Sequence, residues 1–116
     1  MHDEATTYFQ DMIDNMAIGH KFLLETFGYV PTIGWQIDPF GHSEANADMY
    51  AKMGFDALFF MRADYQDKAK RMENKTMEML WVPKSGTGAP EGIFTHILYR
   101  HYWFPDGFCF DVRCSD

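Results

Sequence analysis

The 116-residue sequence is poor in basic residues and lacks a long apolar run. Lys and Arg number 10 against 17 Asp and Glu, and the resulting net charge of −7 at pH 7 argues against a nucleic-acid partner, because such a partner requires a basic face. No stretch approaches the roughly 20 consecutive apolar residues that a membrane-spanning helix needs. The opening residues 1–4, Met-His-Asp-Glu, are acidic where a secretory signal is basic and then apolar, so we expect no signal peptide in this sequence.

Aromatic side chains are plentiful instead, at 17% of the chain, with eleven Phe, six Tyr and three Trp. The 47% hydrophobic and 23% charged content is that of an ordinary globular protein, and the length allows one domain at most. Aromatic rings bury large areas, and a chain this small has little interior to hold them. The surplus of aromatic residues is the first indication that part of the protein against which these side chains pack is missing from this chain.

Helix and strand patterns alternate along the chain. Apolar periodicity predicts a long helix that ends at Gly28, a second helix from Glu44 to about Met53 with Ser43 as its N-cap, and a polar third helix over about 64–75. Strands are expected at 32–37, 56–61 and 93–98, whereas 76–82 is either a strand or a helix end followed by a strand. The segment 83–92 is a predicted loop, and 99–116 is an aromatic tail without a firm period.

This alternation predicts an α/β fold with parallel crossovers. Three or four strands are too few for a closed barrel, and both outer strands would be left as unpaired edges. We therefore predict a piece of a larger α/β domain. A small complete α/β domain is the alternative.

The stretch 34–43, Gly-Trp-Gln-Ile-Asp-Pro-Phe-Gly-His-Ser, carries the clearest chemical signal. Asp38 falls just past a predicted parallel strand, at the carboxyl end where ligand chemistry gathers in α/β proteins. Pro39 biases Asp38 toward extended dihedrals, and the helix N-terminus after Ser43 adds positive potential. Two interpretations are open: a nucleophile, base or metal ligand, or an Asx-turn residue that satisfies loop N–H groups.

Three segments together resemble glycoside hydrolase family 38, in particular its lysosomal, acidic α-mannosidase branch. They are the stretch 34–43, the run Met-His-Asp-Glu-Ala at 1–5 and Arg-Ala-Asp-Tyr-Gln-Asp at 62–67. The resemblance covers nearly the whole chain. It implies that residues 1–116 are part of the N-terminal catalytic domain, an incomplete segment of a parallel α/β barrel with three to four strands alternating with helices. The remainder of that domain is then a partner of this chain.

The resemblance implies hydrolysis of terminal α-D-mannose from N-linked glycans, with zinc and with retention through a covalent intermediate on one carboxylate. It gives Asp38 two roles, nucleophile and zinc ligand. It places Phe40 against the sugar ring, Arg62 near the nucleophile, where its charge would help to keep Asp38 ionised, and Tyr102 at an active-site tyrosine. The alternative for Arg62 is a solvated residue at the start of a helix. The alternative for Tyr102 is ordinary aromatic packing.

The histidines are sufficient in number for a zinc site. The family's zinc histidines, however, belong to an upstream His-x-Asp motif and a distant downstream segment, and neither is in this sequence. The resemblance therefore assigns no zinc to His96 or His101. We expect His42 to contact the residues around the site rather than a ligand, or to form a hydrogen bond within the turn. We expect His96 to pack or to form a hydrogen bond structurally, and His2 simply to lie near the beginning of this sequence.

Cys109 and Cys114 are close enough in sequence to form a disulfide, and two buried free thiols are the alternative. Relatives of the lysosomal branch carry a similar segment, which implies a bridge and an oxidising lumen. Asn74 begins a glycosylation sequon, Asn-Lys-Thr. The expected location is a lysosome or another acidic lumen of the secretory pathway.

Two alternative identities of the protein stay open from the sequence. The first is a neutral or Golgi-type member of the same family, which Gln36 and the residues 64–67 disfavour. The second is a non-catalytic structural α/β fragment, or a homologue that has lost its activity.

Overall fold

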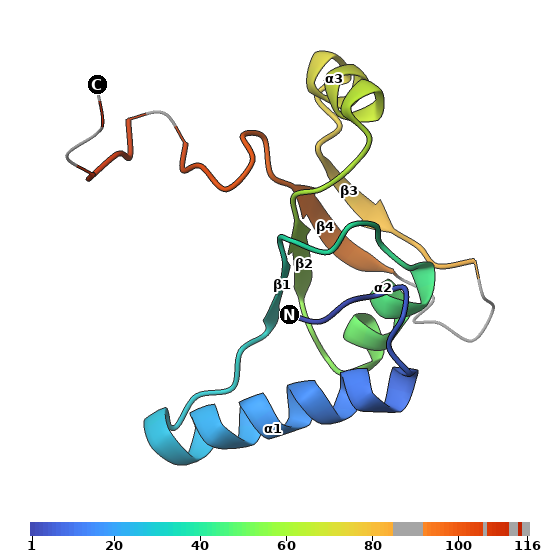
Figure 1. The fold of residues 1–116 in the computed structure, drawn as a ribbon, viewed down its shortest axis with the longest axis vertical. Helices are drawn as coiled ribbons and strands as arrows, with labels where there is room; N and C mark the ends of the chain where they lie inside the picture. Colours follow the sequence, from blue (N-terminus) through green and yellow to red (C-terminus); the bar gives the residue numbers. More distant parts are fainter. Residues whose placement is uncertain (85–91, 106, 112–113, 115–116) are drawn as a thin grey trace.

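The computed structural model describes residues 1–84, 92–105, 107–111 and 114. These residues form three helices and one four-stranded sheet (Figure 1). Most of the predicted loop 83–92 and several positions of the predicted tail lie outside the described residues. The elements follow the chain in this order: α1 Phe9–Phe27, β1 Ile33–Gln36, α2 Glu44–Lys52, β2 Ala57–Phe60, α3 Tyr65–Asn74, β3 Glu78–Trp81 and β4 Ile93–Ile97.

Several of the helix ends follow local sequence chemistry. Gly28 adopts the left-handed conformation at φ 67° and donates its N–H to the carbonyl of Leu24, which ends α1 as predicted. Asp64 caps α3, because its carboxylate accepts from two backbone N–H groups of the first turn. Ser43 stands at the start of α2, but its side chain makes no capping hydrogen bond.

The sheet has the order β1-β2-β4-β3. Strands β1, β2 and β4 are parallel to one another, and α2 forms the crossover between β1 and β2. Strand β3 is confirmed as a strand but runs antiparallel to β4. The expectation that all strands are parallel is therefore wrong for β3. The sequence between β3 and β4, 82–92, is shorter than the dozen or more residues that a parallel crossover usually requires, which favours antiparallel pairing of these two strands.

The core lies on one face of the sheet, under α2. Tyr50 is fully buried and packs against Phe55, with ring centroids 4.6 Å apart. This cluster also contains Ala47, Leu58 and Ile93, and a second one comprises Phe60, Met77 and Ile97.

The opposite face of the sheet is largely open. It presents Trp35 and Phe94, and α1 exposes Phe22 and Phe27. Part of the aromatic surplus therefore lies on surfaces that the described residues leave uncovered. None of the helices in the described part of the chain is long and apolar enough to cross a membrane.

Candidate active site

The site begins where β1 and β2 end at the same edge of the sheet. Gln36 is paired with Phe60, and Asp38 and Arg62 each lie two residues beyond that pair. The parallel register therefore brings together two side chains that are 24 positions apart. Arg62 donates from Nε and Nη2 to Oδ1 of Asp38, at 3.0 and 2.6 Å.

Tyr102 joins this pair from the segment after β4. Its hydroxyl donates to Oδ1 of Asp38 and accepts from Nη2 of Arg62 at 3.0 Å. The three side chains thus form a closed triangle of hydrogen bonds. The structure places Tyr102 directly on the proposed nucleophile, which is a more specific position than the substrate contact expected from the sequence.

Phe40 stacks against Arg62. The guanidinium carbon of Arg62 is 4.0 Å from the centre of the Phe40 ring, a cation–π contact. Phe40 is 84% exposed, so most of this side chain is accessible despite its contact with Arg62. An exposed ring beside a fixed carboxylate is a suitable surface for a ligand with apolar C–H faces.

The hydrogen bonds set the charge of each group. The pKa of Asp38 is lowered from its ordinary value, first by the Tyr102 hydroxyl and then by Arg62. The pKa of Arg62 is raised by its hydrogen bond to Asp38, and the pKa of Tyr102 is raised by the same carboxylate. Asp38 is therefore an anion held by a permanent cation and a neutral phenol.

The two carboxylate oxygens of Asp38 are not equivalent. Arg62 and Tyr102 both bind Oδ1, and Oδ2 makes no hydrogen bond with the described residues. A cavity of about 420 Å³ borders Asp38 and Phe40, within the size range of small-ligand sites. The residues 1–3, Ala5 and Pro39 complete its lining.

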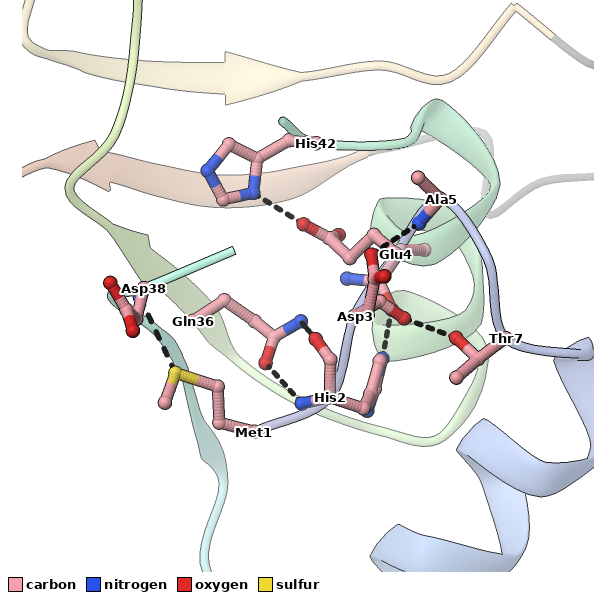
Figure 2. A network of polar contacts seen from close by, with 10 residues as sticks. Met1, His2, Asp3, Glu4, Ala5, Thr7, Gln36, Asp38 and His42 are labelled. Atoms are coloured by element: carbon pink, nitrogen blue, oxygen red, sulfur yellow. Dashed lines mark hydrogen bonds and ion pairs between the residues drawn. The ribbon is translucent and has the colours of Figure 1, made fainter. Parts of the chain in front are cut away.

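The N-terminal segment, residues 1–5, is tied to the end of β1 and to α2. The backbone N–H of His2 donates to Oε1 of Gln36 at 3.1 Å, and Nε2 of Gln36 donates to the His2 carbonyl at 3.0 Å (Figure 2). The His2 ring is also hydrogen-bonded to Oδ1 of Asn46, at 2.8 Å. The sequence did not predict these contacts of His2, because its partners are 34 and 44 positions away and leave no local sign.

The same segment reaches the loop that carries Asp38. Nδ1 of His42 is hydrogen-bonded to Oε2 of Glu4, and the backbone N–H of Asp38 points to the sulfur of Met1 at 3.4 Å (Figure 2). His42 thus has a partner outside its own turn. Sequence analysis missed Glu4; the only available signal was its position in the run 1–5 that carries the family resemblance.

The described residues do not hold a complete set of metal ligands. Within the ranges that the structure describes, no three His, Cys, Asp or Glu residues gather closely enough to hold a metal ion. Nδ1 of His42 is bound to Glu4, and Nδ1 of His96 lies 2.8 Å from Oε1 of Glu78. Asp38, with Oδ2 open among the described residues, fits the role of one ligand, and further ligands would have to come from outside the described residues.

Cys109 and Cys114 are joined by a disulfide, with their Cα atoms 5.9 Å apart. The bridge implied by the resemblance is thus present, and the free-thiol alternative is wrong for both cysteines. Asn74 is the last residue of α3 and is exposed, so the sequon is sterically accessible.

Comparison with known proteins identifies the family. The glycosyl hydrolases family 38 N-terminal domain matches residues 1–115, and the chain belongs to this family. It is 51% identical to an α-mannosidase of Arabidopsis thaliana, over 97% of this chain and 11% of that protein. It is 52% identical to the lysosomal α-mannosidase of Dictyostelium discoideum, over 96% and 11%, and 44% identical to that of Homo sapiens, over 100% and 12%. The chain therefore spans about a ninth of the length of these relatives.

Proposed function

We propose that this chain is a segment of the catalytic domain of a zinc-dependent, retaining α-mannosidase, with Asp38 as its nucleophile. The domain is a parallel α/β barrel, and the substrate is terminal α-D-mannose on N-linked glycans. The observation that carries the proposal is the clamping of Asp38 through one oxygen by Arg62 and Tyr102. Membership of family 38 supports the reaction class.

Asp38 attacks the anomeric carbon of the mannose. A carboxylate oxygen bonds to that carbon, the glycosidic bond breaks, and the leaving oxygen takes a proton from an acid outside this chain. Water then hydrolyses the ester and restores the carboxylate. Arg62 and Tyr102 keep Asp38 ionised and fix its plane, so that attack begins from a near-attack geometry.

Phe40 and the cavity beside it provide the sugar surface. Phe40 offers its exposed ring to the C–H groups of the sugar, while Arg62 holds the ring from the other side. Zinc, when bound, would supply Lewis-acid binding of the sugar hydroxyls, and Asp38 is the residue of this chain that would hold it. Tyr102, half exposed, is within reach of the same substrate.

A lysosomal or similarly acidic lumen is the proposed location. The Cys109–Cys114 disulfide supports an oxidising compartment. Several relatives are named lysosomal α-mannosidases, and the accessible sequon at Asn74 agrees with passage through the secretory pathway.

The test is hydrolysis of an aryl α-mannoside by the complete protein. The wild type should turn over and release the α-anomer first, as seen by NMR. Asp38→Asn should keep its circular dichroism spectrum and lose activity by about 10⁴-fold or more, because the amide does not attack. Asp14→Asn, an exposed change on α1, is the matched control and should be fully active. A folded, inactive wild type would favour the non-catalytic homologue, and an active Asp38→Asn would remove the nucleophile assignment.

A further inference from the structure

The loop that carries Asp38 has no regular secondary structure to hold it in place. Residues 37–43 contain no helix or strand, and the Asp38 side chain is 48% exposed. A nucleophile on such a loop needs an external constraint if it is to stay within a few tenths of an ångström of its attack position. His42, four residues further along, provides one.

His42 is held between two separate parts of the chain. Its ring packs on Phe60 of β2 with centroids 4.1 Å apart, and Nδ1 is bound to Glu4. Only 9% of the His42 side chain and 2% of the Glu4 side chain are accessible to solvent. A buried carboxylate that loses its partner is costly, so the loop cannot swing away from residues 1–5 without a penalty.

The beginning of the loop is fixed to the same segment. Gln36, fully buried at the end of β1, makes the two backbone hydrogen bonds to His2. Beyond the loop, Asn46 of α2 holds the His2 ring and is 1% exposed. Asp38 thus lies between two anchors, Gln36 and His42, that share one short partner segment (Figure 2).

We infer that Glu4 and His42 are positioning residues for the reaction. Their buried pair, together with the two hydrogen bonds between Gln36 and the His2 backbone, fixes the position of Asp38 in the catalytic site. The inference rests on the proposed function of Asp38 as nucleophile. Neither residue touches the carboxylate. They act through the loop, so their loss should impair the transition state more than substrate binding.

The experiment uses the complete protein and four variants. Glu4→Ala and His42→Ala remove the pair, whereas Glu4→Gln keeps an oxygen that accepts from His42 but loses the charge. Glu78→Gln is the matched control, because Glu78 forms the same kind of pair with His96. His96 is aligned with Phe59, the neighbour of Phe60, and so projects from the opposite face of the sheet. The kcat and KM for an aryl α-mannoside and the Tm are measured for each.

The two alanine variants should lower kcat by about 100-fold and change KM by less than about threefold, the signature of a displaced nucleophile. Glu4→Gln should fall between them and the wild type, at about a tenfold loss of kcat, since a neutral hydrogen bond is weaker than a charge-assisted one. The Glu78→Gln variant should retain the wild-type kcat.

Folded variants that keep the wild-type kcat, with or without a lower Tm, would overturn the inference and leave the proposed function intact. If the alanine variants do not fold, Glu4→Gln decides: a selective loss of kcat supports positioning, and an unchanged kcat overturns it. A folded but inactive wild type would overturn the proposed function and this inference with it.

Discussion

Arg62 donates from two of its nitrogens to a single oxygen of Asp38, at 3.0 and 2.6 Å. The contact follows from strand register, because both residues lie two positions past the Gln36–Phe60 pair of neighbouring parallel strands. It leaves Oδ2 clear of the described residues. A carboxylate held in this way is charged, oriented and still accessible.

Arg62→Lys should reduce kcat/KM by about 10–100-fold. A lysine brings a point charge, but it does not reproduce two hydrogen bonds from one planar group that also stacks on Phe40. Steady-state kinetics of the complete protein measure the effect. Arg71→Lys, which alters an i,i+4 pair with Asp67 on α3, is the control and should be active. Equal activity of Arg62→Lys and the control would show that the paired hydrogen bonds from the planar guanidinium to Asp38 are unimportant.

Tyr102→Phe should move the acid limb of the pH profile of kcat/KM to higher pH. The Tyr102 hydroxyl is the largest cause of the lowered pKa of Asp38, whose ordinary value is 3.8. Without that donor the pKa rises, and the anion that attacks is lost at a higher pH as the solution is acidified.

The stability effect of the same variant has the same sign. A carboxyl group whose pKa is lowered on folding stabilises the protein above its unfolded pKa, and this contribution is lost as pH falls through the folded pKa. Tyr102→Phe therefore removes stability at pH values above the ordinary carboxyl pKa, and little in strong acid. Tyr8→Phe, an exposed change before α1, should leave both profiles in place. An acid limb that stays where it is, or moves down, would contradict the role of Tyr102.

Gly34→Ala should destabilise the fold by about 1–3 kcal/mol through overpacking. An added Cβ would lie 2.5 Å from Cε1 of Tyr50, a ring that is fully buried in the core under α2. Gly19→Ala is the matched control: nothing lies within 4 Å of its Cβ, and the helical site should gain about 0.5–1 kcal/mol. Denaturant unfolding of the two variants should give opposite signs, and equal signs would contradict the packing described for β1.

Asn74 should carry a glycan when the protein is made in a eukaryotic secretory pathway. The residue is exposed at the end of α3, and Thr76 completes the sequon. Enzymatic deglycosylation followed by peptide mass spectrometry should convert Asn74 to Asp, and Thr76→Ala should abolish the modification. An unmodified peptide from the secreted wild type would count against the proposed route.

Local chemistry accounts for much of what the sequence predicted. The turn 38–42 follows a strand, Gly28 ends α1, and Arg62 comes just after β2. What escaped prediction depends on long-range contacts. The direction of β3 is decided by its pairing with β4, and the burial of Glu4 depends on His42, 38 residues away. No periodicity in residues 1–5 marks Glu4 as the buried residue of that segment, because its partner is a single side chain in a distant loop.

The most direct test of the account is covalent trapping. A mannoside fluorinated on the ring and carrying a good leaving group should form a long-lived ester with the nucleophile of the complete protein. Peptide mass spectrometry should then find the sugar on the peptide that contains Asp38, and Asp38→Asn should remain unlabelled. A sugar found on another carboxylate, such as Asp3 or Asp64, would contradict the central claim that Asp38 is the nucleophile.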